Sequence, residues 1–343
     1  MTDIEVYYPT GRNLADWEAS HARGALPDRW PYGLNKMALD GHTSLRPVEA
    51  LPLRPLEVAK SLLRRRRTGF TGRTHSHAIA WDEDLALRLA AERPYSAKFC
   101  GVIWTTDRLV RRDSSIKDTV LKAILPDFSG LWVLSRPQIP VLNEWLGSKV
   151  PPIEFLRFGI DEQFFTPSPY PHDPMILSIG RDRDRDPDTL FEALHEIRRD
   201  RPDARIVVQT TSDRPLPPGV TGIQMLPHAE LRDLYRRASV VLVATKPNLH
   251  VSGMTVALES MATARPVVMS RTPGMEDYVE DGMTGLLYSP GDAEGMARGV
   301  LRLLDDPGGA ELMGHQGRRA VEDRHTTAQM ARRIREMVLG CSA

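Results

Sequence analysis

The chain lacks net charge, paired cysteines and long apolar runs, and each absence excludes a class of protein. Its 343 residues include 45 lysines and arginines against 45 aspartates and glutamates, which argues against a dedicated nucleic-acid binder. The two cysteines, Cys100 and Cys341, lie far apart and match no metal-ligand spacing, as is usual in a reducing compartment. No apolar run reaches the roughly 18 residues that a membrane span requires, and the acidic start is unlike a secretory signal. We therefore expect a cytoplasmic protein that binds no nucleic acid.

Short apolar segments alternate with amphipathic helical patterns throughout the second half of the chain. We expect strands at 175–180, 204–209, 222–226, 240–245, 266–270 and 285–288. Runs of valine, isoleucine and leucine that are separated by helices are typical of a parallel sheet covered on both faces. The sequence therefore predicts a doubly wound α/β domain, in which ligands bind at the carboxyl ends of the strands.

The first half of the chain shows the same alternation less regularly. Strands are expected at 4–9, 76–81, 97–104 and 130–135, with an irregular segment at 10–32. A stretch rich in proline and aromatic residues, 151–174, indicates a linker with little regular structure. The chain is long enough for two domains, and its last helical pattern, 326–340, can cross back onto the first. We expect two α/β domains with a cleft between them, at 1–165 completed by 326–343, and at 166–325.

The stretch HVSGMTVALESMATARPVV (250–268) places a serine and a glycine directly before a helical pattern. Ser252 is a good N-cap, and Gly253 would let a ligand approach the backbone closely. The N–H groups of Gly253, Met254 and Thr255, with the helix dipole, suit a phosphate. Glu259 lies on the same face, about 9 Å along the axis from Gly253, which is near the distance from a pyrophosphate to ribose hydroxyls. The alternative is a buried strand–helix corner with an exposed glutamate.

The stretch SIGRDRDRDPDTL (178–190) gathers arginines where another strand is expected to end. Gly180 ends the strand, and Arg181 and Arg185 follow in the loop before a helix. Two guanidinium groups at this edge can neutralise a diphosphate leaving group, or they can simply pair with the neighbouring aspartates in a solvated loop. The same letters contain D-x-D, which suits a hard cation, but arginines at every other position would compete with the cation. We therefore expect no metal.

Together these residues resemble the donor domain of family-4 retaining glycosyltransferases, from about Pro151 to Asp306. That family has the GT-B fold, in which two Rossmann-like doubly wound domains face each other across a cleft. The segments that carry the resemblance are FLRFGIDEQFFTP (155–167), SIGR (178–181) with Arg185, MLPHAELRDLYRRASVVLVAT (225–245), SGMTVALESMATARPVV (252–268) and GMTGLLYSPGD (282–292).

The resemblance implies a hexosyltransferase that moves a sugar from a nucleoside diphosphate to an acceptor hydroxyl with retention of anomeric configuration. Arg181 and Arg185 would contact the diphosphate, the backbone at Met225 and Leu226 would hold the base, and Glu259 would hold the ribose. The first domain would bind the acceptor, and the second the donor. One retaining route lets a diphosphate oxygen take the acceptor proton. That route needs neither an enzymatic nucleophile nor a metal or other cofactor.

Three positions depart from the family pattern. The acid that touches the donor sugar in the family falls on Val251, and the adjacent His250 is placed to replace part of its function. The second basic residue of the diphosphate loop is supplied by Arg185 only if the loop is one residue shorter, since Asp186 otherwise occupies the place. The glycine-rich loop after the first strand is reduced to Gly33. The departure at Val251 concerns the sugar, not the nucleotide.

The acceptor side offers fewer signals. Asp82 and Glu83 follow one expected strand and Asp107 another, where they would touch the acceptor or the sugar, or alternatively cap the next helix. The run Arg64–Arg67 would meet an anionic lipid or a phosphorylated acceptor at a membrane surface, or form a solvated helix face. The acceptor itself, whether a glycan, a lipid-linked glycan or a small natural product, is not specified. Two other functions stay open: a non-catalytic sugar-nucleotide-binding protein, and a sugar-nucleotide epimerase of the same fold.

Overall fold

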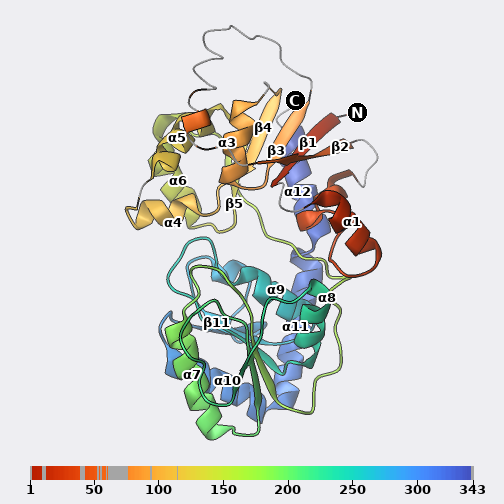
Figure 1. Ribbon diagram of the computed structural model, residues 1–343, viewed down its shortest axis with the longest axis vertical. Coiled ribbons are helices and arrows are strands. Elements are labelled where there is room, and N and C mark those ends of the chain that lie inside the picture. Colours follow the sequence, from red (N-terminus) through yellow and green to blue (C-terminus); the bar gives the residue numbers. More distant parts are fainter. Residues whose placement is uncertain are drawn as a thin grey trace. The chain divides into compact units, whose positions relative to one another are not determined.

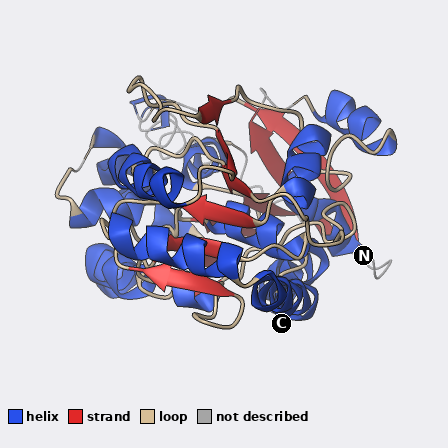
Figure 2. Cartoon of the chain, turned by 90° about the horizontal axis from the view of Figure 1, so that it is seen from below, coloured by secondary structure: helices blue, strands red, loops and turns tan. Residues whose placement is uncertain are grey.

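The computed structural model describes residues 2–9, 13–38, 43–51, 54, 56–58, 60, 76–92, 95–113 and 115–340. The chain folds into two compact units (Figure 1). Unit 1 comprises Met1–Ala19, Arg29–Leu156 and Ala328–Ala343, and unit 2 comprises Ser20–Asp28 and Arg157–Thr327. The expected domain boundary falls later, after residue 165. Each unit contains a six-stranded parallel sheet flanked by helices (Figure 2), which confirms the expectation of two Rossmann-like domains.

Unit 1 is built on a sheet with the strand order β2-β1-β3-β4-β5-β6. Its strands are β1 (Thr2–Pro9), β2 (Thr43–Ala50), β3 (His77–Ala80), β4 (Ala97–Gly101), β5 (Gly130–Val133) and β6 (Ile153–Phe155). The helices that accompany it are α1 (Leu14–Ala22), α3 (Glu83–Ala91), α4 (Thr105–Val110), α5 (Ile116–Ile124), α6 (Gln138–Leu146) and α12 (Thr327–Gly340), with short 3-10 turns η2 (Pro31–Ala38), η3 (Leu125–Asp127) and η4 (Gly147–Lys149).

Three of these elements were not expected from the sequence. Strands β2 and β6 are the two edges of the sheet, and most of their residues are only partly buried. An edge strand has one paired side and needs no continuous apolar run, and β2 even tolerates Pro47. Helix α1 lies in the segment that was expected to be irregular, because its single buried residue, Leu14, produces no apolar stripe.

Unit 2 has the strand order β12-β11-β10-β7-β8-β9. Its strands are β7 (Met175–Ser178), β8 (Arg205–Val208), β9 (Val220–Gly222), β10 (Val240–Val243), β11 (Val267–Ser270) and β12 (Gly285–Tyr288). Its helices are α7 (Pro187–Asp200), α8 (His228–Arg237), α9 (Met254–Ala262), α10 (Ala293–Asp305) and α11 (Pro307–Arg324), with a 3-10 turn η5 (Met275–Asp277).

The core of unit 2 explains why its strands were predictable. β7, β10 and β11 are buried along their whole length, so apolar runs mark them in the sequence. Helices α7 and α10 pack side by side and share one hydrophobic cluster with the sheet, whereas α9 packs against α11 (Figure 1). The expected bounds of the strand at 222–226 were wrong. The strand β9 ends at Gly222, and Met225 beyond it is 69% exposed.

None of the helices that the structure describes combines the length and apolar character that a bilayer crossing requires. The arginine run at 64–67 lies outside the described residues.

Candidate functional site

Two loops at the carboxyl edge of the unit 2 sheet are joined by their backbones. The first follows β7 and the second follows β10, and these strands are neighbours in the sheet. The N–H of Lys246 donates to the carbonyl oxygen of Asp184 at 2.8 Å, and the N–H of Asp186 donates to the carbonyl oxygen of Ala244 at 3.0 Å. Asp186 also caps α7. The backbone bonds fix the arginine-bearing loop against the loop that leads into α9.

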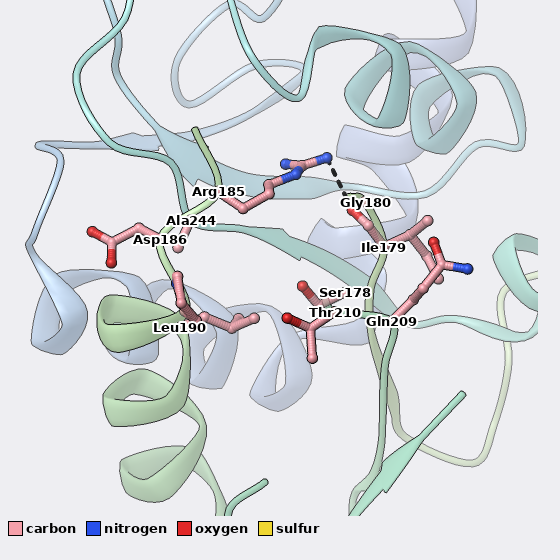
Figure 3. A pocket seen from close by; sticks show the side chains of 10 residues that line it. Ser178, Ile179, Gly180, Arg185, Asp186, Leu190, Gln209, Thr210 and Ala244 are labelled. Carbon is pink, nitrogen blue, oxygen red and sulfur yellow. Dashed lines mark hydrogen bonds between the residues drawn. The ribbon is translucent and has the colours of Figure 1, made fainter. Parts of the chain in front are cut away.

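The guanidinium of Arg185 lies between the backbones of two glycines. Its Nη2 donates to the carbonyl oxygen of Ile179 at 3.0 Å (Figure 3). A Cβ atom at Gly180 would stand 2.0 Å from Nη2, and one at Gly253 would stand 2.8 Å from Nη1. Both glycines also have positive φ, 135° and 90°. The absence of a Cβ atom at Gly180 and Gly253 therefore makes room for the guanidinium of Arg185. The expected approach of a ligand to Gly253 stays a prediction.

Part of the hydrogen-bonding capacity of the Arg185 guanidinium is unused among the described residues. Its Nε and Nη1 atoms are buried and have no hydrogen-bond partner among the described residues. Burial lowers the pKa of the Arg185 guanidinium, while the nearby Asp182 favours its charged form. A guanidinium remains charged even so. A buried cation with two unpaired nitrogen donors suits an anion with several oxygen atoms.

The entrance to α9 differs from the expected serine cap. Gly253 is the N-cap, with left-handed φ, and no side chain caps the helix. The N–H of Ser252 donates to Asn248 Oδ1 at 2.9 Å, and the Ser252 hydroxyl donates to Asp182 Oδ1 at 3.0 Å. The prediction that Ser252 caps α9 is therefore wrong, because its hydroxyl donates to Asp182 in the loop after β7.

The three N–H groups expected to hold a phosphate are not equivalent. The N–H of Met254 donates to the carbonyl oxygen of Val251 at 3.0 Å within the turn that starts the helix. Met254 is buried, whereas Thr255 is exposed on the first turn and Gly253 is partly exposed. The N–H of Met254 therefore holds the turn, while a phosphate contact at Gly253 and Thr255 stays a prediction.

Glu259 lies in the second turn of α9 and faces Tyr235 of α8. The Tyr235 hydroxyl donates to Glu259 Oε2 at 2.7 Å. Burial raises the pKa of Glu259 to about 7, against the opposing effects of the Tyr235 hydrogen bond and the charge of Arg185. Glu259 is therefore poised to titrate near neutral pH, which the sequence did not indicate. Tyr235 is a partner that sequence reasoning missed, since it fits the apolar stripe of α8 like any core residue.

Asp182, Asp184 and His250 gather in front of the α9 entrance. His250 Nε2 lies 3.5 Å from Asp182 Oδ2, and His250 Nδ1 lies 3.7 Å from Asp184 Oδ2. Each residue offers one ligand atom within 4.8 Å of the others, a donor set that could hold a divalent cation. Burial would raise the pKa of Asp182, but His250, the N–H of Asp184 and the Ser252 hydroxyl together hold it well below its usual value.

Val251 occupies the position at which the family pattern has an acid. Its side chain is 1% exposed and its φ is 53°, a left-handed value that is strained for a β-branched residue. Val251 offers no polar group to a ligand. The neighbouring His250 is buried as well, and its ring faces the two aspartates.

Arg181 lies on the exposed side of its loop, beside the segment expected to hold a base. Its Nη1 lies 3.3 Å from Met225 Sδ. Met225 is exposed and Leu226 is partly buried, so this short segment after β9 presents both side chain and backbone at the surface of unit 2.

A small cavity opens below Arg185 at the ends of β7 and β8 (Figure 3). Its lining includes Ser178, Gly180, Gln209 and Thr210. A volume of about 20 Å³ suits a single water molecule rather than a nucleotide.

In unit 1, the Glu83 side chain has a structural role. It is 0% exposed and accepts hydrogen bonds of 2.8–2.9 Å from the N–H groups of Ile103, Trp104 and Thr105 and from the Thr105 hydroxyl. The structure corrects the expected contact with an acceptor, since these bonds hold the turn after β4. Asp107 is also buried, at 2% exposure in the first turn of α4.

Asp82 caps α3, the structural alternative considered above. Its Oδ1 accepts from the N–H groups of Asp84 and Leu85, both at 3.1 Å. Burial, with the nearby acids adding to it, raises the pKa of Asp82 to about 6 despite those hydrogen bonds. Asp82 is partly exposed, so it stays a candidate for acceptor contact.

Gly33 lies in a kink of η2 with φ of 66°, and its N–H donates to the carbonyl oxygen of Trp30 at 2.9 Å.

Part of the chain is similar in sequence to known glycosyltransferases. Residues 173–306 match the model of the family described as Glycosyl transferases group 1. A stretch of 65 residues, 19% of the chain, is 43% identical to D-inositol 3-phosphate glycosyltransferase from Kribbella flavida, and it spans 15% of that protein.

Two solved structures resemble the whole chain in fold. Sucrose-phosphate synthase from Thermosynechococcus elongatus matches with a TM-score of 0.73 at 18% identity, covering 100% of both chains. Alr3699/HepE from Anabaena, in complex with UDP-glucose, matches with a TM-score of 0.67 at 15% identity, covering 99% of this chain and 100% of that one. At these identities the likeness shows the fold. The chain thus has the GT-B fold, and its residues 173–306 are similar to the group 1 glycosyl transferases.

Proposed function

We propose that the protein transfers a hexose from a nucleoside diphosphate to an acceptor hydroxyl, with retention of anomeric configuration. The observation that carries the proposal is the buried guanidinium of Arg185, whose Nε and Nη1 lack partners among the described residues beside the entrance to α9. A diphosphate supplies the charge and the oxygen atoms that this guanidinium and the helix entrance suit. The match of residues 173–306 to group 1 glycosyl transferases supports the same assignment.

The rest of the donor fits around this anchor. The α9 entrance at Gly253 and Thr255 would receive the diphosphate, and Arg181 would face it from the exposed side of its loop. Glu259 would accept hydrogen bonds from the ribose in its ionised form. The segment at Met225 and Leu226 would hold the base. The UDP-glucose complex of the structurally similar Alr3699/HepE makes a uridine donor the first choice.

In the proposed reaction the acceptor oxygen forms a bond to the anomeric carbon on the face from which the diphosphate departs. The bond between that carbon and the phosphate oxygen breaks, and the acceptor proton passes to a diphosphate oxygen. Arg185 and Arg181 offset the charge that develops on the leaving group. This route uses no protein nucleophile, and we propose that it needs no metal or other cofactor.

The acceptor and the location of the reaction are also proposals. Asp82 is the acid of unit 1 that remains partly exposed at a strand end, and we assign it to acceptor contact. The low cysteine content supports a reducing compartment such as the cytoplasm. Peripheral contact with a membrane through the arginines at 64–67 stays a prediction, as does the choice of acceptor among glycans, lipid-linked glycans and small natural products.

A second candidate is a protein that binds the sugar nucleotide without turning it over. The buried, apolar Val251 favours it, because no acid stands at that position. Release of free nucleotide decides between the two. Purified protein is incubated with UDP-, GDP-, ADP- and TDP-hexoses and a panel of acceptors. Acceptor-dependent nucleotide release supports transfer, whereas tight donor binding without release across the panel favours the binding protein.

A further inference from the structure

We propose that Asp182 recognises the hydroxyl groups of the donor sugar. The proposal rests on the proposed function, since it concerns the sugar carried by the same diphosphate. Asp182 lies in the loop after β7, and its side chain is 31% exposed in front of the α9 entrance. Val251, at the position where the family pattern has an acid, is buried and apolar.

The carboxylate of Asp182 is held firmly in one place. Oδ1 accepts from the N–H of Asp184 at 2.8 Å and from the Ser252 hydroxyl at 3.0 Å, while Oδ2 faces the ring of His250 at 3.5 Å. Ser252 directly precedes Gly253, the N-cap of α9. A group fixed in this way can select a ligand by geometry, because little side-chain entropy is lost on binding.

Electrostatics decides which part of the donor Asp182 contacts. The side chain is ionised at neutral pH, since its partners hold its pKa well below the usual value. An ionised carboxylate repels phosphate oxygens and accepts hydrogen bonds from neutral hydroxyl groups. The donor group attached directly to the terminal phosphate is the sugar. A diphosphate seated on Arg185 and the α9 entrance therefore brings the sugar hydroxyls, rather than the base, toward this acid.

The same atoms could instead hold a divalent cation with Asp184 and His250. The charge of Asp182 acts on the guanidinium of Arg185, so a cation here would be repelled by a buried arginine. The sugar is the better ligand for this reason, and the cation becomes an outcome of the test.

The test compares binding of a nucleoside diphosphate with and without its sugar. The probe is whichever of the UDP-, GDP-, ADP- and TDP-hexoses binds the wild-type protein most tightly, and calorimetry gives its Kd and that of the bare diphosphate. D182N keeps the Oδ1 acceptor for Asp184 and Ser252 and removes the charge. We expect D182N to weaken the sugar nucleotide by about 10- to 100-fold and the bare diphosphate by less than about threefold. D188N, an equal charge change at an exposed residue of α7, should alter neither.

Four further results complete the test. S252A removes the hydroxyl that positions Asp182, so it should weaken the sugar nucleotide in the same direction by a smaller factor. If D182N leaves the ratio of the two Kd values unchanged, the inference is wrong while the proposed function stands. If the wild-type protein binds the bare diphosphate only with Mn²⁺, and Mn²⁺ no longer promotes binding in D182N, Asp182 holds a cation and the inference is wrong. Failure of the wild-type protein to bind any of these diphosphates would overturn the proposed function, and the inference with it.

Discussion

The two units use their buried charges differently. In unit 1 the buried Glu83 has four internal hydrogen bonds and holds the turn after β4. In unit 2 the guanidinium of Arg185 is set between two glycine backbones with Nε and Nη1 unused among the described residues. A buried charge that is fully paired stabilises the fold around it, whereas one left partly unpaired marks a place for a ligand.

Removal of the Glu83 carboxylate should have the largest effect on stability. Glu83→Ala leaves three buried N–H groups and a hydroxyl without an acceptor, and we expect it to lower the free energy of unfolding by about 3–5 kcal/mol. Urea denaturation followed by circular dichroism measures this. Asp84→Asn is the control, because the Asp84 side chain is 45% exposed and pairs with Lys117. A change below about 0.5 kcal/mol for Glu83→Ala would remove the distinction between the units.

A side chain at Gly253 should affect both stability and nucleotide binding. Gly253→Ala forces a Cβ atom against Arg185 Nη1 and Val243 Cγ1, each 2.8 Å away, at a φ of 90°. We expect a loss of about 1–3 kcal/mol in stability and at least about a tenfold loss in diphosphate affinity. Gly291→Ala is the matched control, since Gly291 has φ of 87° and a Cβ atom there would meet no described atom within 4 Å. Equal losses of diphosphate affinity in the two variants would show that Arg185 is not displaced.

The raised pKa of Glu259 should make unit 2 less stable as pH rises. A carboxyl whose pKa is about 7 when folded and 4.5 when unfolded binds more protons in the folded state between these values. Its stabilising contribution is therefore complete below about pH 4.5 and declines as pH rises toward 7. Because the side chain is partly exposed, we expect a decline of about 1–2 kcal/mol.

Glu259→Gln should remove this part of the pH dependence. Denaturation series at pH 5.0 and 7.5 on the wild type and the variant measure the difference. An unchanged slope between the two pH values would mean that the Glu259 pKa is not raised.

Particular residues show how much the sequence could predict. The strands of unit 2 were predictable because β7, β10 and β11 are buried on both faces and therefore consist of continuous apolar runs. Edge strands β2 and β6 were missed because half-buried strands need no such pattern. The loop residues of the candidate site were selected by their position after strands, which local sequence supplies.

Roles that depend on distant partners could not be predicted. Glu83 bonds to residues about twenty positions away, and only the packed unit shows that its carboxylate is used there. The same holds for the Ser252 hydroxyl, which a local rule assigns to helix capping and the fold directs to Asp182. The seat of Arg185 between Gly180 and Gly253 likewise joins loops more than sixty residues apart in the chain.

The central claim is that Arg185 receives a diphosphate, and binding of UDP against uridine tests it most directly. Calorimetry on the wild type, Arg185→Ala and Arg199→Ala separates the phosphate contribution from that of the nucleoside, with exposed Arg199 as the control for lost charge. Arg185→Lys keeps the charge in case the alanine variant unfolds. We expect Arg185→Ala to weaken UDP by about 100-fold, with uridine binding unchanged and Arg185→Lys intermediate. Equal UDP affinity in the wild type and the folded Arg185 variants would contradict the account.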